Sequence, residues 1–167
     1  MEDLVTAFSH KLTMETNFYW KKATKRVVEV SIFDYALISS EKHSYDSGLD
    51  ADEEREIKEA IIASEKNRDT HLFIPRLSVD ERIDLMNEFI SAQKDPAQKT
   101  TLQNTLNQLI ELSQAKPINL LKNGFKMGFD LNDLTLNSKD LTQAWTEFFR
   151  AEIKYKVNQW LNVTSSL

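Results

Sequence analysis

The sequence contains no cysteine, which excludes disulfide bonds, thiolate zinc sites, iron–sulfur clusters and cysteine nucleophiles. Only three glycines and three prolines occur in 167 residues, so sheets built on many tight turns are disfavoured. No stretch approaches the roughly 18 consecutive apolar residues of a membrane-spanning helix. The amino-terminal MEDLVTAFSHKL also lacks the pattern of a secretory signal. We therefore expect a cytoplasmic protein with no cofactor and no membrane contact.

What the sequence does contain is typical of a globular protein, with 41% hydrophobic and 10% aromatic residues. The length suits one domain over 1–167. Its predicted parts are an amino-terminal helix and hairpin at 1–38, an acidic loop and helix at 39–67, and a helical remainder at 68–167. The formal net charge is -5, from 21 basic and 26 acidic residues. The nine acidic and four basic residues between positions 41 and 66 account for the whole excess.

Strand signals occur early in the chain. Phe18-Tyr19-Trp20 and Val27-Val28-Glu29-Val30 flank a polar stretch and predict a β-hairpin over about 18–30. Residues 71–75 (HLFIP) form a short apolar run that ends in proline, which cannot donate a ladder hydrogen bond. We predict an edge strand there, and with the hairpin a small antiparallel sheet. The fold class is therefore α+β, mainly helical.

Helix signals dominate the rest of the chain. A short amphipathic helix is expected from Glu2 to about residue 15, and Asp50 can cap a helix that runs to about residue 67. Ser78 and Glu81 form a capping box for a helix to about residue 93, and Asp95-Pro96 starts the next one. Another helix is expected after Lys116-Pro117. The most regular pattern runs from 140 to about 161, and its apolar face comprises Leu141, Trp145, Phe148, Phe149, Ile153, Val157 and Trp160.

Several short motifs occur in order along the chain, at residues 24–31, 73–75 with Met86 and Phe89, 116–122 and 145–161. Together they resemble uncharacterised protein family 0158, a bacterial family of small proteins of unknown function. Residues 24–31 (TKRVVEVS) are similar to the family's hairpin of the type YLDxxTGEVV, with Lys25 and Arg26 in place of its glycine and acid. Residues 73–75 with Met86 and Phe89, residues 116–122, and residues 145–161 are similar to its strand-proline-MxxF, PFxxFK and WxxF…WL segments. The resemblance implies no activity, because the family has none assigned.

The hairpin carries the candidate binding residues, because aromatic rings beside cations are what single-stranded nucleic-acid sites use. The predicted set is Tyr19, Lys21, Lys22, Lys25 and Arg26. The alternative, which we favour, is that Phe18 and Trp20 belong to the core and the basic turn is a solvated tip.

Other constellations are less specific. His10, His43 and His71 fall in three different predicted elements, so no metal site is expected. The acidic stretch 46–52 suggests a calcium loop, but the closing glutamate would fall on Ile57 or Ile61, so we expect a solvated loop. Residues 124–128 lack the pattern of a phosphate-binding loop. A catalytic pair of carboxylates stays an alternative, because a sequence does not show which carboxylates lie close together in the fold.

These observations favour a non-enzymatic protein-interaction module. It would bind another protein, or a second copy of itself, through its acidic helix or its aromatic carboxyl-terminal helix. One alternative is a nucleic-acid-contacting accessory protein that uses the basic aromatic hairpin. Another is a small hydrolase with a carboxylate pair.

Overall fold

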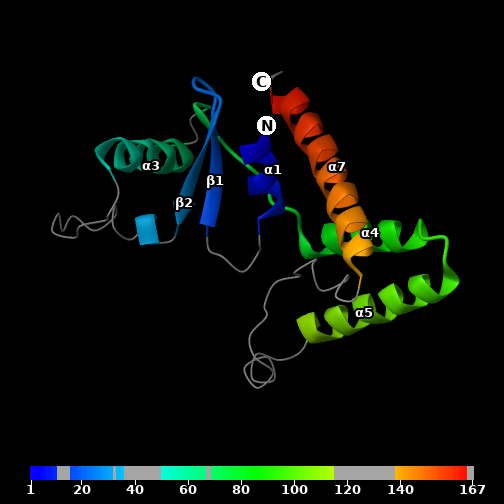
Figure 1. Ribbon diagram of the computed structural model, residues 1–167. Helices are drawn as coiled ribbons and strands as arrows, with labels where there is room; N and C mark the ends of the chain where they lie inside the picture. Colours follow the sequence, from blue (N-terminus) through cyan, green and yellow to red (C-terminus); the bar gives the residue numbers. More distant parts are fainter. Residues whose placement is uncertain (11–15, 32, 36–49, 67–68, 115–137, 165–167) are drawn as a thin grey trace. The chain divides into compact units, whose positions relative to one another are not determined.

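The structure is a computed structural model that describes residues 1–10, 16–31, 33–35, 50–66, 69–114 and 138–164. These residues form two compact units (Figure 1). The first unit contains α1, the β-sheet and α3 and ends at Arg76, and the second begins at Leu77 and contains α4, α5 and α7. The fold class is mainly helical α+β, as predicted. A single domain over 1–167 stays a prediction.

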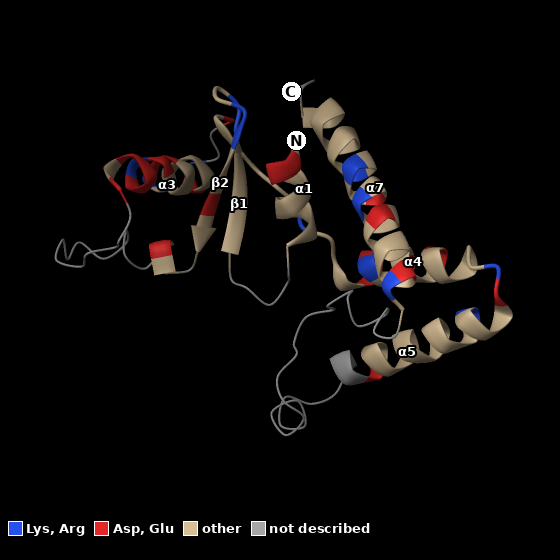
Figure 2. Cartoon of the chain, viewed as in Figure 1, with Lys and Arg blue, Asp and Glu red and all other residues tan. Residues whose placement is uncertain are grey.

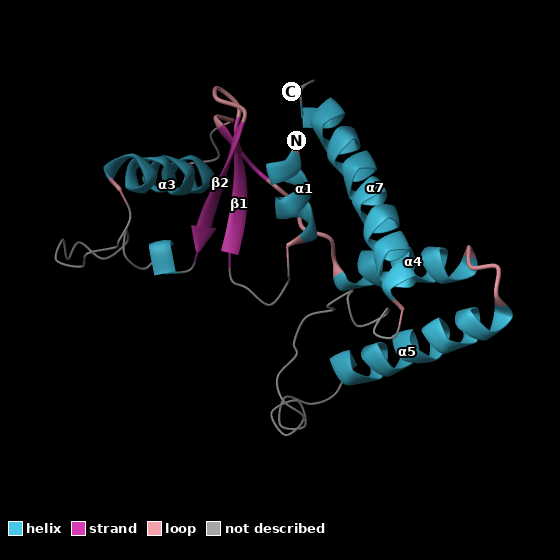
Figure 3. Ribbon diagram, viewed as in Figure 1, coloured by secondary structure: helices cyan, strands magenta, loops and turns pink. Residues whose placement is uncertain are grey.

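The sheet of the first unit is antiparallel and has β1 at its centre (Figure 3). β1 (Thr16–Lys21) pairs with β2 (Arg26–Ser31) on one side and with β3 (His71–Phe73) on the other. Among the residues that the structure describes, both outer strands are therefore sheet edges. The predicted hairpin and third strand are confirmed, with the turn between the first two strands at residues 22–25.

Two helices contact this sheet. α3 (Ala51–Glu65) packs on the face that carries Tyr19, and α1 (Glu2–Ser9) contacts β2. On the face opposite α3, the ring of His10 lies edge-on to Phe18, with centroids 4.8 Å apart. α1 is shorter than predicted, because its C-cap is His10, and residues 11–15 lie outside the described residues. The core between the sheet and α3 consists of Tyr19, Val28, Val30, Ile57, Ala60 and Ile61.

The start of α3 follows from three residues. The carboxylate of Asp50 accepts hydrogen bonds from the backbone N–H of Asp52 at 2.9 Å and of Glu53 at 2.8 Å. The Glu53 carboxylate in turn accepts from the backbone N–H of Asp50 at 3.2 Å. This is a complete capping box, and it satisfies backbone donors that the first turn of a helix leaves without partners.

The second unit is helical. α4 (Val79–Ser91) contacts both α5 (Pro96–Gln114) and α7 (Lys139–Thr164). The predicted capping box of Ser78 and Glu81 opens α4, and Asp95 accepts a hydrogen bond from the backbone N–H of Ala97 at the start of α5. The predicted helix after Lys116 lies outside the described residues. None of the helices in the described ranges has the length and hydropathy needed to cross a bilayer.

The predicted apolar face of α7 is buried at Trp145, Ile153 and Val157, and its other four residues are partly buried. The fully or nearly fully buried apolar side chains of the second unit are Leu77, Leu85, Met86, Phe89, Ile90, Leu102, Leu106, Trp145, Ile153 and Val157. Each such aliphatic or aromatic side chain contributes roughly 1.5–3 kcal/mol when it leaves water. Packing of the amphipathic faces, rather than intrinsic helix propensity, therefore stabilises these helices.

Candidate functional site

The hairpin places the five predicted binding residues on different faces. Residues opposite each other in the ladder share a face, so Tyr19, Lys21 and Arg26 lie on the α3 side of the sheet. Lys22 and Lys25 belong to the turn, where the backbone N–H of Lys25 donates to the carbonyl of Lys21 at 2.9 Å. The set is therefore divided between the covered face and the turn.

Tyr19 is buried beneath α3, with only 3% of its surface exposed. Its hydroxyl lies 3.0 Å from that of Tyr35 and donates to Ser64 Oγ at 3.4 Å. Burial, and next the hydrogen bond with Tyr19, raise the pKa of Tyr35 to about 12. In this structure the Tyr19 ring has no free face on which a base could stack.

Lys21 and Arg26 pair with the acidic helix. Lys21 Nζ lies 2.7 Å from Glu59 Oε2 and 3.8 Å from Glu56 Oε1, and Arg26 Nη1 lies 3.5 Å from Glu56 Oε1. Figure 2 shows the acidic residues concentrated along α3 and basic residues at the hairpin of the same unit. The two charged segments that the sequence presented as separate binding surfaces thus partly neutralise each other.

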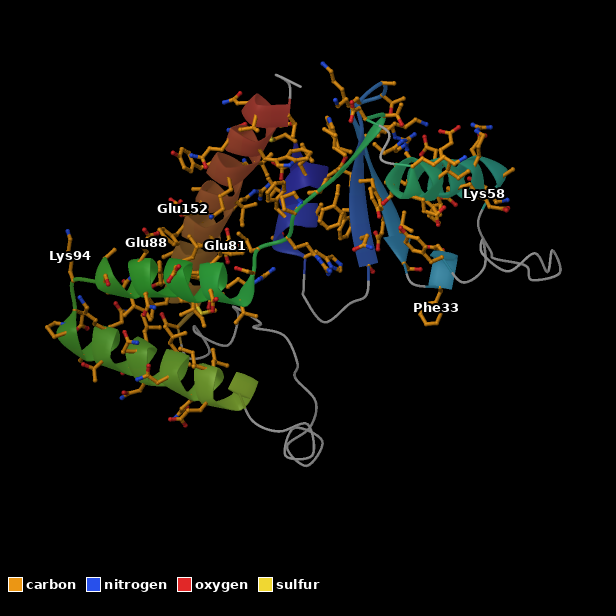
Figure 4. The ribbon with its side chains drawn as sticks, turned by 180° about the vertical axis from the view of Figure 1, so that it is seen from behind. Phe33, Lys58, Glu81, Glu88, Lys94 and Glu152 are labelled. Atoms are coloured by element: carbon orange, nitrogen blue, oxygen red, sulfur yellow. The ribbon has the colours of Figure 1, made fainter. Side chains whose placement is uncertain are left out.

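Two further pairs lie within α3 itself. Arg55 contacts Asp52 at 2.8 Å, and Lys58 pairs with Glu54. Lys58 is labelled on α3 in Figure 4. Four of the six acidic side chains of α3 therefore lie beside a cation before any partner binds, namely Asp52, Glu54, Glu56 and Glu59.

Lys22 and Lys25 remain as the cations of the turn. No salt bridge between described residues involves either of them, and Lys25 is exposed. Lys25 has a φ of 54°, in the left-handed region that favours glycine. Binding by the five predicted residues stays a prediction, and the turn lysines are its accessible part.

Glu56 and Glu59 bring two carboxylates to one cation, which is the nearest counterpart of the hydrolytic pair considered from the sequence. The hydrogen bond from Lys21 lowers the pKa of Glu59. A carboxylate held in its ionised form cannot donate a proton at neutral pH, and general acid catalysis needs a raised pKa. Glu56 and Glu59 therefore have the properties of carboxylates in structural ion pairs with Lys21 and Arg26.

The β3 edge is a surface that the sequence indicated only in part. Ile74 N–H donates to the Phe18 carbonyl, and Lys22 N–H donates to the Thr70 carbonyl. Because hydrogen-bonded pairs alternate along an antiparallel ladder, Leu72 directs its N–H and C=O toward β1. His71 and Phe73 direct theirs away from β1, and no hydrogen bond between described residues uses these groups.

Phe73 makes this edge apolar. Its ring lies edge-on to Tyr19 with centroids 6.0 Å apart, yet 53% of the residue is exposed. The run of apolar residues before Pro75 predicted an edge strand. The exposure of the Phe73 ring could not be predicted from the sequence. Alternation assigns a residue to one face of the sheet but does not show whether another element covers that face near the sheet edge.

The β2 edge is different. By the same alternation its outward backbone groups include those of Val27, Glu29 and Ser31. Glu29 is exposed, and the Ser31 N–H is already bonded to Asp34 Oδ2 at 2.6 Å. Charged side chains and satisfied backbone donors are common means by which proteins protect an edge from pairing.

The aromatic part of α7 mainly builds the second unit. Trp145 is buried, and its ring centroid lies 5.1 Å from that of Phe89 on α4. Phe148 and Phe149 pack around the same indole, with centroids 5.8 and 5.4 Å away. The aromatic helix therefore belongs to the core along this part of its length.

No group of three or more potential ligands within the described ranges is arranged to hold a metal ion. His10 and His71 lie in different elements, and His43 falls outside the described residues. The acidic stretch 46–52, predicted to be a solvated loop, lies partly outside the described residues, and the glycines at 124 and 128 lie wholly outside them.

Comparison with known proteins adds no family: no family model, curated protein or solved structure matches this chain.

Proposed function

We propose that this chain is a protein-interaction module that binds an extended segment of another protein as an added strand on the β3 edge. The observation that supports it is the half-exposed ring of Phe73 beside backbone groups of His71 and Phe73 that form no hydrogen bond with any described residue. In strand addition, main-chain hydrogen bonds supply affinity and contacts with alternate side chains supply specificity.

The contrast between the two edges favours β3 as the docking strand. β2 is protected by the charge of Glu29 and by the bond between Ser31 and Asp34. Within the described part of the chain, the protection of β3 is limited to its length of three residues and the proline at position 75. Short edges limit uncontrolled pairing, so a bound segment would be short and would need an apolar side chain against Phe73.

The acidic helix and α7 support this function less well than they did from the sequence. Ion pairs within the first unit compensate much of the charge of α3, and exposed pairs of this kind give little binding energy. The aromatic residues of α7 around Trp145 are occupied by core packing.

A peptide selection tests the proposal. A phage library of random extended peptides would be selected against the full chain, and enriched peptides titrated by NMR. We expect binding to be lost in Phe73→Ala and retained in Phe33→Ala, which removes a still more exposed phenylalanine away from the β3 edge (Figure 4). We also expect slower amide exchange at His71 and Phe73 in the complex, because those amides acquire acceptors.

Two results would reject strand addition. One is the absence of any enriched peptide. The other is binding that leaves the exchange of both outward amides unchanged, or that Phe33→Ala weakens as much as Phe73→Ala.

The nucleic-acid alternative keeps one supporting observation, the exposed turn with Lys22 and Lys25 unpaired among the described residues. We expect any affinity for oligo(dT) or single-stranded RNA to be weak, to fall steeply with salt, and to be lost in Lys22→Ala with Lys25→Ala. No detectable binding at low salt would remove this alternative.

Membership of uncharacterised protein family 0158 and a cytoplasmic, bacterial setting are also proposals. The positive φ of Lys25 supports the family resemblance, because it occurs where the family's hairpin has glycine. The change would leave the turn conformation in place at a cost in stability.

A further inference from the structure

His71 on β3 is a buried histidine with unusual surroundings. Only 8% of the residue is exposed. Its Nδ1 lies 3.2 Å from Thr70 Oγ1, whereas its Nε2 is buried and has no hydrogen-bond partner among the described residues. A buried polar atom without a partner costs roughly 1–3 kcal/mol. The buried position of His71 is therefore less stable than it would be if Nε2 had a hydrogen-bond partner.

The charges that face His71 are already matched. His71 lies opposite Lys21 in the ladder, and Lys21 lies opposite Arg26, so all three are on the α3 face. From α3, Glu56 and Glu59 face the same cluster and pair with the two cations. A proton on His71 would add a positive charge to a cluster whose formal charges already sum to zero.

The ionisation of His71 follows from these surroundings. Burial, and next the charge of Lys21, lower its pKa from the ordinary value of 6.5, while Glu59 and Glu56 act in the opposite direction. The neutral form is therefore favoured in the folded protein, and an opened state takes up the proton more readily. The contribution of neutral His71 to the stability of the folded state is fully present above about pH 6.5. It is lost as the pH falls from 6.5 toward the lower pKa that His71 has in the folded protein.

We propose that His71 makes the attachment of β3 sensitive to acid: its protonation loosens β3 from β1 and α3 while the rest of the protein stays folded. Opening of β3 would expose the backbone groups of β1 that now pair with Leu72. This inference goes beyond the proposed function and needs no partner. If strand addition also occurs, acid would release the bound segment together with β3.

The test is an NMR experiment on the full-length wild-type chain. The His71 ring signals give its titration midpoint, and exchange of the Leu72 amide, corrected for the intrinsic effect of pH, gives the opening of β3. We expect a midpoint below 6.5, the ordinary value. We expect Leu72 protection to fall by up to about tenfold per pH unit below that value, while Met86 in α4 is unaffected.

Two lysine variants separate this mechanism from a general effect of acid. Lys21→Met removes the cation opposite His71 and leaves Glu59 available to a protonated imidazole, so the midpoint should rise and the acid-induced opening should shrink or reverse. Lys22→Met is the matched control, because Lys22 is the next residue along the chain but belongs to the turn, forms no salt bridge with a described residue, and is not among the charges that shift the pKa of His71. It should leave both readouts unchanged.

In His71→Phe, the protection of the Leu72 amide from exchange should no longer change with pH in the mildly acidic range. The inference is overturned if the wild-type midpoint is at or above 6.5, or if Leu72 protection does not follow the His71 titration. It is also overturned if Lys21→Met and Lys22→Met shift the midpoint equally. These outcomes depend on the wild type and the lysine variants, so they remain decisive if His71→Phe does not fold.

Discussion

Lys25 provides a direct test of the hairpin conformation. It has a φ of 54°, and it is the one residue other than glycine with a positive φ in the part of the chain that the structure describes. A side chain with a Cβ atom is strained there, and the left-handed conformation costs an L-residue roughly 1–2 kcal/mol. Replacing Lys25 with glycine removes that strain.

The size of the effect comes from two opposing terms. Glycine removes roughly 1–2 kcal/mol of strain in the folded turn, but its freedom in the unfolded chain takes back roughly 0.4–1 kcal/mol. We therefore expect Lys25→Gly to raise the free energy of unfolding by about 0.5 kcal/mol. Lys25→Val should lower it by about 1 kcal/mol, since a β-branched residue tolerates positive φ least.

Urea unfolding, followed through the NMR signals of β1, measures these differences in the first unit. Ala23→Gly is the control in the same turn, because Ala23 has no positive φ to relieve. It should lower stability by about 0.5 kcal/mol through the unfolded chain alone. If Lys25→Val proves as stable as Lys25→Gly, or Ala23→Gly stabilises equally, the left-handed turn is refuted.

Three further predictions concern ion pairs and caps. A double-mutant cycle of Lys21→Met and Glu59→Gln should give a coupling free energy of about 0.5 kcal/mol, since the pair is partly exposed, and zero coupling would contradict a structural role. Ser78→Ala should destabilise by about 1 kcal/mol in urea unfolding through loss of the α4 cap, whereas Ser91→Ala at the end of that helix should have little effect. The backbone hydrogen bond from Ser78, with Lys156, lowers the pKa of Glu81 from 4.5, and Lys21 lowers that of Glu59. Their stabilisation is present above pH 4.5 and is lost as the pH falls below it, so the urea midpoint should decrease in that window, and an unchanged midpoint would count against both contacts.

The helix starts could be predicted because their determinants are local. The groups that cap α3 and α4 are within three positions of Asp50 and Ser78, so the pattern contains the whole interaction. The apolar stripe of Ile57, Ala60 and Ile61 on α3 is predictable for the same reason, because periodicity along one helix identifies the side that packs.

The candidate site was predictable only as a set of residues, since its contacts are non-local. Lys21 and Glu59 are 38 positions apart, and their contact depends on which face of β1 meets α3. Alternation along β1 places Tyr19 on the face opposite Phe18, and because both faces are covered, both side chains are buried. Charge counts along the chain could not show that the acidic helix and the basic hairpin are each other's partners.

The aromatic packing around Trp145 gives the second unit its own optical signal. An indole that is buried between Phe89, Phe148 and Phe149 is shielded from water, so its fluorescence emission should lie at short wavelength. Trp20 is half-buried in the sheet of the other unit and experiences different surroundings. Spectra of chains that keep one indole at a time would therefore follow the melting of each unit separately, without any attached dye.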